Sequence, residues 1–266
     1  MNNIAIAKET IRFTQAREYQ YGADPVQMPV ADYESVIVIS PDTANELLTE
    51  PLPDEKLNAP CITEVTTEDS FSAAQRLGNA LVLNFANAHH VGGGFLLGAN
   101  AQEEALCRCS TLYGSISSDT AREMYHYNNT HLRATESDYM LLSPDVCVFR
   151  DHRCEPLREP FMTSVITAPA PNRRGAAMFT SNDKLAAVFL RRANIIFRAA
   201  VHYGYRNLVL GAWGCGAFGN DPRIVAEAFK SALKQDGLEM YFDKVCFAVY
   251  GNETSNNYRT FKLVFK

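Results

Sequence analysis

Hydrophobic residues recur at helical spacing in four segments of the chain. Near the N-terminus, residues 3–17 place apolar side chains on one face with charged residues between them, a pattern that predicts an amphipathic helix. Residues 183–202 and 224–233 carry broader apolar faces of the same period, and residues 70–77 form a shorter predicted helix. These segments are therefore predicted to be helices.

Short apolar runs rich in β-branched residues lie between these helices and predict strands. The runs are Val36–Ile39, Cys61–Val65, Leu81–Phe85, Ser164–Ala168, Leu208–Gly211 and Val245–Val249. The segments that separate the later runs are long enough for crossover helices, so we expect parallel pairing with helices on both faces of the sheet. Residues 18–32 are predicted to be a polar loop, and residues 151–159 a polar surface excursion.

The composition is that of an ordinary globular protein. The chain has 266 residues, of which 47% are hydrophobic and 21% charged, and it contains no fixed-period repeat or low-complexity tract. A chain of this length can bury a sizeable core without a disulfide or a structural metal. No shift in composition marks a boundary, so residues 1–266 are expected to form one domain.

The charge balance and the cysteine content limit which binding partners and which cellular compartment are expected. Lys and Arg number 25 against 30 Asp and Glu, so the overall field does not favour a grip on DNA or on an anionic membrane. Any anionic ligand must therefore be held locally. The seven cysteines include no Cys-x-x-Cys pair, and neither a signal peptide nor a run of 18 apolar residues is visible. We expect a cytoplasmic protein with no membrane segment.

A first glycine-rich loop follows the strand predicted at 81–85. Three consecutive glycines, 92–94, are followed after seven residues by Gln102, Glu103 and Glu104. Without Cβ atoms, glycines permit positive φ and allow backbone N–H groups to approach a ligand closely, as a sugar diphosphate requires. The helix dipole alone also favours two glutamates at the start of a predicted helix, so both interpretations stay open at this point.

A second glycine-rich loop, residues 211–222, follows the strand predicted at 208–211. Asp221 is the expected N-cap of the next helix and Pro222 its first residue. Such a loop delivers its amides to a helix N-terminus, an arrangement that holds phosphate. Its G-x-G-x-x-G spacing also suggests a dinucleotide-binding fold, but no acidic residue ends the following strand, which disfavours that interpretation.

Together the two motifs resemble those of the poly(ADP-ribose) glycohydrolases. The three glycines, the seven-residue gap and the Gln-Glu-Glu triplet follow that family's signature. Residues 213–219, Trp-Gly-Cys-Gly-Ala-Phe-Gly, look like its diphosphate loop. Residues 6–10 and 165–172 are similar to the compact microbial branch, so the resemblance covers nearly the whole chain.

The resemblance implies an α/β fold with a macrodomain-like, three-layer α/β/α arrangement around a mixed sheet. An N-terminal helical extension over about residues 1–60 is expected to pack on this core. The resemblance also implies hydrolysis of the ribose–ribose O-glycosidic bond of poly(ADP-ribose), which releases ADP-ribose and uses no metal or organic cofactor.

The same resemblance assigns roles to individual residues. Glu104 is the implied catalytic acid/base, while Glu103 and Asn87 orient the reacting ribose. Phe218 is expected to press on the terminal ribose. Tyr250 is expected either to stack under the adenine or simply to pack in the core. The full set implied to bind substrate is Asn87, Gly92, Gly93, Gly94, Gln102, Gly214, Cys215, Gly216, Ala217, Phe218, Gly219 and Tyr250.

The chemistry of acetal cleavage independently requires these residue types. The leaving ribose oxygen must receive a proton from an acid whose pKa lies near neutral. Burial and a neighbouring carboxylate both raise the pKa of a carboxyl group, so adjacent glutamates on an apolar wall suit this task. Amides that hold a diphosphate away from the reacting bond would orient the sugar.

Other interpretations of single residues remain open. His89 and His90, with the two glutamates, suggest a metal cluster, but adjacent histidines point apart in an extended chain. Cys215 lies beside a helix N-terminus, where a thiol can become reactive, although a small residue packed beneath the loop is favoured. The arginines at 173–174 either add positive charge near the site or form a solvated surface pair.

Three other functions share features of this sequence. A non-hydrolytic ADP-ribose reader would use the same fold and phosphate loop, but it has no need for a carboxyl group beside the glycosidic bond. A mono-ADP-ribosyl hydrolase would use the same site with a different leaving group. A nicotinamide-dependent oxidoreductase would bind NAD in preference to ADP-ribose. The sequence is silent on oligomeric state and physiological target.

Overall fold

Seven strands form the central sheet of the structure, a computed structural model that describes residues 2–266. Their bounds are β3 Ile37–Ile39, β4 Ile62–Thr66, β5 Ala80–Ala86, β6 Met140–Arg150, β7 Pro156–Pro169, β8 Asn207–Leu210 and β9 Lys244–Ala248. Their order is β3-β6-β7-β5-β8-β9-β4. The strands from β7 to β4 run parallel, as expected. At the other edge, which that expectation did not cover, β3, β6 and β7 are antiparallel neighbours.

The antiparallel edge arises from a hairpin that the sequence pattern did not predict. Strands β6 and β7 are joined by residues 151–155, where Asp151 N–H donates to Glu155 O at 2.9 Å. A turn this short can join only antiparallel strands. Residues 156–159 of the predicted surface excursion form the start of β7, in which Arg158 and Glu159 are exposed.

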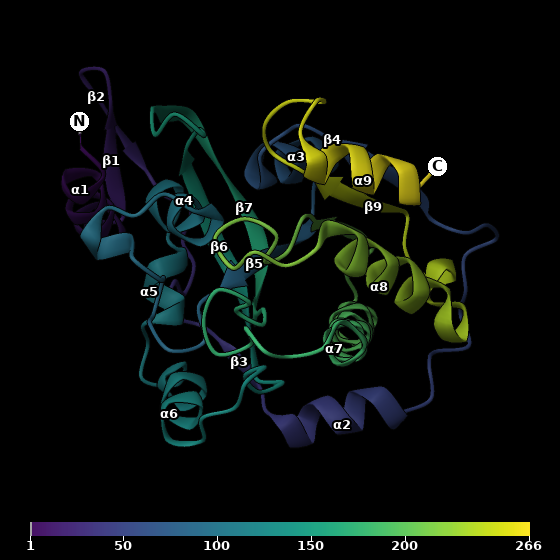
Figure 1. The fold of residues 1–266 in the computed structure, drawn as a ribbon. Coiled ribbons are helices and arrows are strands. Elements are labelled where there is room, and N and C mark those ends of the chain that lie inside the picture. The colour runs from purple at the N-terminus through teal and green to yellow at the C-terminus, as the bar shows by residue number, and fades with distance from the viewer. Residues whose placement is uncertain (1) are drawn as a thin grey trace.

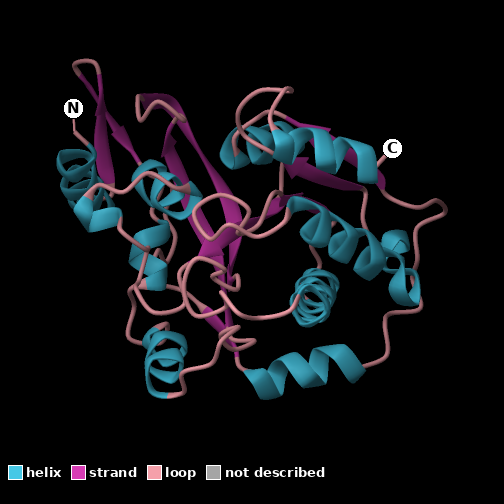
Figure 2. Ribbon diagram, in the orientation of Figure 1, coloured by secondary structure: helices cyan, strands magenta, loops and turns pink. Residues whose placement is uncertain are grey.

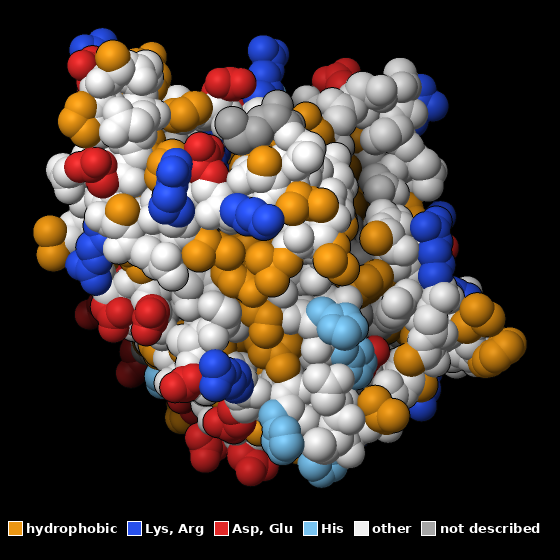
Figure 3. Space-filling model, turned by 90° about the vertical axis from the view of Figure 1, so that its left-hand side faces the viewer, with side chains coloured by type: hydrophobic (Ala, Val, Ile, Leu, Met, Phe, Trp, Pro, Cys, Tyr) orange, Lys and Arg blue, Asp and Glu red, His pale blue; other side chains and the backbone are white. Residues whose placement is uncertain are grey.

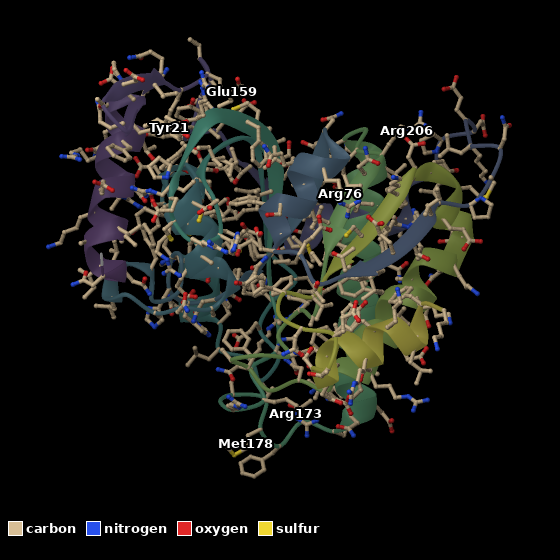
Figure 4. The ribbon with its side chains drawn as sticks, turned by 90° about the horizontal axis from the view of Figure 1, so that it is seen from above. Tyr21, Arg76, Glu159, Arg173, Met178 and Arg206 are labelled. Carbon is tan, nitrogen blue, oxygen red and sulfur yellow. The ribbon has the colours of Figure 1, made fainter. Side chains whose placement is uncertain are left out.

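Residues 18–32, predicted as a polar loop, contain a two-stranded hairpin. Its strands are β1 Glu18–Tyr21 and β2 Asp24–Gln27. Most of its side chains are exposed and polar, which hides the strand pattern, and only Tyr19 is buried, against Phe149. Figure 4 shows Tyr21 of this hairpin beside Glu159 of β7, so both hairpins project on the same side of the molecule.

Helices cover both faces of the sheet (Figure 1, Figure 2). Their bounds are α1 Asn3–Ala16, α2 Pro41–Thr49, α3 Ser70–Leu77, α4 Gln102–Cys109, α5 Leu112–Ile116, α6 Arg122–Thr130, α7 Asn182–His202, α8 Pro222–Lys234 and α9 Asn256–Val264. Helices α2, α7, α8 and α9 contribute to the core on one face, and α1, α3, α4, α5 and α6 to the core on the other. The predicted three-layer α/β/α arrangement around a mixed sheet is confirmed.

Strand β5 shows how one apolar run builds both cores. Leu81 and Leu83 are buried in the core beneath α7 and α8, while Ala80 and Val82 are buried in the core on the opposite face. Successive side chains of a strand point to opposite sides of the sheet, and here both sides are covered. The run is therefore continuously apolar instead of alternating with polar residues.

The N-terminal helix α1 packs against α4, the helix that carries the two glutamates. Thr10 Oγ1 donates to Arg108 O at 2.9 Å, and Asn3 Nδ2 donates to Gly98 O at 3.1 Å. The segment expected to form an extension, about residues 1–60, also contains β3, so it supplies an edge strand to the sheet. Across residues 2–266, every helix is too short or too polar to cross a membrane.

Candidate active site

The carboxyl ends of β5, β8 and β9 border a cavity of about 740 Å³. Its wall contains residues that follow each of these strands: Asn87 after β5, Ala212 after β8 and Val249 after β9. Sheets with parallel strands bind ligands in crevices at these ends, because the loops that leave neighbouring strands diverge there. This cavity is therefore the candidate active site.

Asn87 begins the first glycine-rich loop. Its side-chain Oδ1 accepts hydrogen bonds from the N–H groups of His89 and His90 at 2.8 and 3.0 Å, which turns the chain away from the sheet. Gly93 then adopts a φ of 57°, and a Cβ atom there would lie 2.5 Å from Glu104 Oε1. Only glycine lets the loop backbone pass this close to the carboxylate.

The two glutamates lie in the first turn of α4 and are both buried, with 3% of Glu103 and 7% of Glu104 exposed. Glu104 Oε1 accepts a hydrogen bond from Gly94 N–H at 2.9 Å, and its Oε2 accepts one from Ala101 N–H at 2.9 Å. Glu103 Oε2 accepts from Asn87 N–H at 2.8 Å. Each carboxyl group is thus fixed by backbone donors at the cavity wall.

Burial raises the pKa of Glu103 to about 8. The charge of Glu104 also raises this pKa, while the hydrogen bonds from Asn87 N–H and from the Asn84 side chain lower it. The sequence predicts a carboxyl group whose pKa is raised by burial and by a neighbouring like charge. In the structure, Glu103 is the carboxyl group with this raised pKa. The glutamate pair therefore retains a proton at pH 7.

Gln102 connects the glutamate turn to the sheet. Its Oε1 accepts from Phe85 N–H at 2.9 Å, and its Nε2 donates to Leu83 O at 2.8 Å and to Ser70 Oγ at 3.1 Å. Although Gln102 lines the cavity, its amide is committed to β5 and α3. Its clearest structural effect is to fix the register of α4 against β5, which sets the positions of both carboxyl groups.

Hydrogen bonds from buried side chains fix the second glycine-rich loop. Trp213 is fully buried, and its Nε1 donates to Ala168 O at 3.0 Å. Asn220 Nδ2 donates to Pro171 O at 2.7 Å and to Gly214 O at 3.1 Å. These bonds tie the loop to the end of β7. Sequence reasoning did not single out Asn220, whose role depends on a contact with residues far away in the chain.

The same loop leads into α8 as predicted. Asp221 caps the helix by accepting from Arg223 N–H at 2.8 Å, and Pro222 is the first helical residue. Gly216 is exposed, and a Cβ atom there would meet no other atom within 4 Å. The loop therefore presents open backbone to the cavity beside a helix N-terminus, which suits an anion.

Most residues predicted to bind substrate meet at this cavity. Those on its wall are Asn87, Gly93, Gly94, Gln102, Glu103, Glu104, Gly214, Gly216, Ala217, Phe218 and Tyr250. Three others lie outside the wall. Gly92 is buried beside Tyr113, Gly219 lies beside Arg174, and the Cys215 thiol donates to Trp213 O. Burial raises the pKa of Cys215, which disfavours a reactive thiol there.

Another part of the wall comes from segments that sequence reasoning did not connect with the site. The turn between β6 and β7 brings His152 within 6.2 Å of Tyr250, measured between ring centroids. Arg108 and Arg150 also line the cavity, although each is only 2% exposed. No motif marks these residues, because the hairpin that carries two of them was itself not predicted.

The histidine and arginine pairs have other partners. His89 Nε2 lies 2.9 Å from Glu136 Oε2, and no group of three potential metal ligands comes together within residues 2–266. Figure 3 shows histidine side chains gathered on one face of the molecule. Arg174 Nη1 donates to Ala217 O at 3.4 Å, beside the second loop. Arg173 lies farther out, near Met178 at the molecule's edge (Figure 4).

The raised pKa of Glu103 predicts a pH-dependent stability. In the unfolded chain a glutamate loses its proton near pH 4.3, whereas folded Glu103 keeps it up to about pH 8. Its contribution is therefore complete below about pH 4.3 and is lost as the pH rises to about 8. The free energy of unfolding of wild type, relative to Glu103→Gln, should fall by on the order of 3 kcal/mol between pH 5 and 8.

Urea denaturation at both pH values measures this difference, with Glu227→Gln on the exposed side of α8 as the matched control. If the Glu103→Gln and wild-type curves keep a constant separation between pH 5 and 8, Glu103 does not hold a proton in the folded protein.

Residues 7–151 match the family described as microbial-type PARG, catalytic domain. The solved poly(ADP-ribose) glycohydrolase (PARG) from Thermomonospora curvata is 37% identical, with 98% of each chain covered and a TM-score of 0.90. A structure of that bacterium's enzyme bound to the inhibitor ADP-HPD is 34% identical, with 98% of each chain covered and a TM-score of 0.85.

The poly(ADP-ribose) glycohydrolase from Deinococcus radiodurans, solved in complex with ADP-ribose, is 34% identical. The match covers 90% of this chain and 98% of that chain, with a TM-score of 0.81. A comparison with curated proteins finds no match. The family match over more than half of the chain, together with these structures, shows that the chain belongs to the microbial-type poly(ADP-ribose) glycohydrolases.

Proposed function

We propose that this chain hydrolyses the ribose–ribose O-glycosidic bond of poly(ADP-ribose) carried by modified proteins, releasing ADP-ribose. The observation that carries the proposal is the placement of two buried, adjacent carboxyl groups and an open glycine-rich loop on the walls of one cavity. Two solved relatives support the ligand class, since one was solved with ADP-ribose and the other with the inhibitor ADP-HPD.

Glu104 is the general acid in this proposal and afterwards the general base. Cleavage of the acetal develops oxocarbenium character on one ribose, while the leaving oxygen of the other accepts a proton from Glu104. The resulting carboxylate then takes a proton from the water that attacks the anomeric carbon. Because Gly93 has no side chain, its backbone lies directly beside Glu104 Oε1.

Glu103 supplies the electrostatic setting for that transfer. Its pKa of about 8 keeps one proton on the pair at neutral pH, so that two negative charges do not face the substrate together. The Glu103 carboxyl group thus holds a proton beside Glu104 at neutral pH. Glu103 also accepts from Asn87 N–H, and we assign both residues to orienting the reacting ribose.

The second loop holds the diphosphate in this proposal. Backbone amides around Gly216, next to the N-terminus of α8, can donate to phosphate oxygens without a charged side chain. Phe218 and Tyr250 provide the aromatic surfaces for the terminal ribose and for the adenine. Binding energy from the diphosphate and the adenine would then orient the scissile bond against Glu104.

We also propose a cytoplasmic location for the protein. All seven cysteines are free thiols in the structure, which suits a reducing compartment.

Hydrolysis should be insensitive to EDTA. Proton transfer by carboxyl groups needs no Lewis acid, and residues 2–266 bring together no set of three side chains suited to hold a metal ion. The rate of ADP-ribose release is measured before and after incubation with the chelator, followed by dialysis. Loss of activity that Mg²⁺ or Zn²⁺ restores would contradict the proposed chemistry.

Parallel incubations with polymer and with mono-ADP-ribosylated protein test the proposed function against its alternatives. We expect rapid shortening of the polymer and little release from the singly modified protein. ADP-ribose binding without turnover of either substrate would favour a reader, and faster turnover of the singly modified protein would favour a mono-ADP-ribosyl hydrolase.

A further inference from the structure

Two thiols lie on the cavity wall and take no part in the proposed reaction. Cys109 is the last residue of α4, and Cys154 lies in the turn between β6 and β7. Cys109 is buried with 4% exposed, whereas Cys154 is half-buried and borders the cavity with it. A dissolved small molecule can therefore reach Cys154 through the cavity.

The turn geometry holds the two cysteines together. Cys109 Sγ donates to Asp151 O at 3.1 Å, and Cys154 N–H donates to the same oxygen at 2.9 Å. Asp151 O thus accepts from the Cys109 thiol and from the Cys154 backbone at once, which places the two cysteines beside each other. Cys154 adopts a φ of 64°, an uncommon conformation for a residue with a Cβ atom, so the turn fixes its direction.

Two buried arginines surround this thiol pair. Arg108 and Arg150 are each 2% exposed, and Arg108 Nε is buried without a hydrogen-bond partner in the structure. The other nitrogens of Arg108 donate to Ala99 O and Asn100 Oδ1, both at 2.6 Å. Of the two arginines, only Arg150 has a carboxylate partner in the described part of the chain, since its Nη2 lies 2.5 Å from Glu9 Oε2. The Arg108 guanidinium beside the pair thus forms no salt bridge within residues 2–266, although the carboxyl group of Asp69 also acts on Cys109.

These surroundings shift the pKa values of the two thiols in opposite directions. The neighbouring Cys109 thiol lowers the pKa of Cys154, and the charges of Arg108 and Arg150 lower it further. The Cys154 thiol and burial raise the pKa of Cys109, to which the charge of Asp69 adds. Cys154 is therefore the more readily deprotonated thiol of the two.

We infer that Cys154 and Cys109 form a peroxide-reactive pair in which Cys154 is oxidised and Cys109 converts it to a disulfide. The Cys154 thiolate attacks one oxygen of the peroxide, the O–O bond breaks and hydroxide leaves, so that Cys154 becomes a sulfenic acid. Cys109 sulfur then attacks Cys154 sulfur. The S–S bond forms, the S–O bond breaks, and the oxygen leaves as water with the Cys109 proton.

The disulfide would link the two walls of the candidate active site. Helix α4 carries Glu103 and Glu104 at its start and Cys109 at its end, while the β6–β7 turn carries His152 beside Cys154. The inference goes beyond the proposed hydrolysis and does not depend on it, since it requires only the thiols and the arginines around them.

Peptide mapping after peroxide treatment tests this inference. Reduced protein is treated with a small excess of hydrogen peroxide, the remaining thiols are alkylated, and the digest is analysed by mass spectrometry without reduction. We expect a Cys109–Cys154 cross-linked peptide as the first product. Half-buried Cys61, whose pKa burial raises to about 11, is the internal control and should stay reduced.

Two serine variants separate the roles of the thiols. Cys109→Ser should give no cross-link and should accumulate a Cys154 sulfenic acid that dimedone traps, whereas Cys154→Ser should leave Cys109 reduced. Iodoacetamide at pH 7 should modify Cys154 of the untreated wild type at least tenfold faster than Cys61. Equal alkylation rates of these two thiols, or no Cys109–Cys154 cross-link in folded wild type, would overturn the inference.

Discussion

Replacing Glu104 with glutamine is expected to abolish hydrolysis of poly(ADP-ribose) while leaving ADP-ribose affinity within about tenfold of wild type. Glutamine keeps the shape of the side chain but has no proton to transfer, and loss of general acid–base catalysis typically costs about 10²–10⁴ in rate. The rate of ADP-ribose release from labelled polymer and titration calorimetry with ADP-ribose measure the two quantities separately.

Stability must be measured beside activity, because the Glu104 oxygens accept from two backbone N–H groups. A glutamine amide can satisfy only one of these donors, which costs about 1–3 kcal/mol. Thermal unfolding followed by circular dichroism identifies any fraction lost to misfolding, and Glu227→Gln is the matched surface control. A folded Glu104→Gln variant that retains more than about a tenth of the wild-type rate would contradict the assignment.

Gly216→Val is expected to weaken ADP-ribose binding by about 2 kcal/mol or more, the scale of losing charge-assisted hydrogen bonds. Since a Cβ atom at Gly216 meets nothing within 4 Å, valine has room in the free protein and folding should be intact. Its methyl groups would instead occupy the space through which a phosphate approaches the loop amides.

Cys215→Ala is the matched control for this variant. Cys215 is the neighbouring residue, but its thiol lies outside the cavity wall and donates to Trp213 O, so its removal should change affinity and rate little. Titration calorimetry on both variants provides the comparison. Wild-type affinity in Gly216→Val would show that the diphosphate does not lie on this loop, and an inactive Cys215→Ala enzyme would assign the chemistry to the thiol.

Regular elements with a strong apolar period could be predicted from the sequence. The helix expected at 70–77 has those same bounds in the structure, and the apolar run at 81–85 lies within β5, which is buried on both faces. The β1–β2 hairpin and β6 could not be predicted in this way. In the β1–β2 hairpin only Tyr19 is buried, so no apolar alternation marks its strands. Strand β6 is defined by its pairing with β7 across a short turn.

In the candidate site, too, the features carried by local motifs could be predicted and those that depend on long-range contacts could not. The glycine loops and the glutamate pair are local motifs, so their meeting at one cavity follows from strands that end side by side. The division of roles within the pair does not follow from spacing, because the raised pKa of Glu103 depends on how deeply the fold buries it. Arg150 lies at the end of β6, and its guanidinium donates to Arg108 O of α4, a long-range contact that no local motif marks.

Chromatography of the products released from labelled poly(ADP-ribose) identifies the bond that the enzyme breaks. Cleavage of the ribose–ribose bond predicts a product that co-elutes with ADP-ribose for the wild type and is missing for Glu104→Gln. Phosphoribosyl-AMP as the product would show cleavage of the diphosphate, and intact polymer with the wild type would show no hydrolysis; either result would contradict the account.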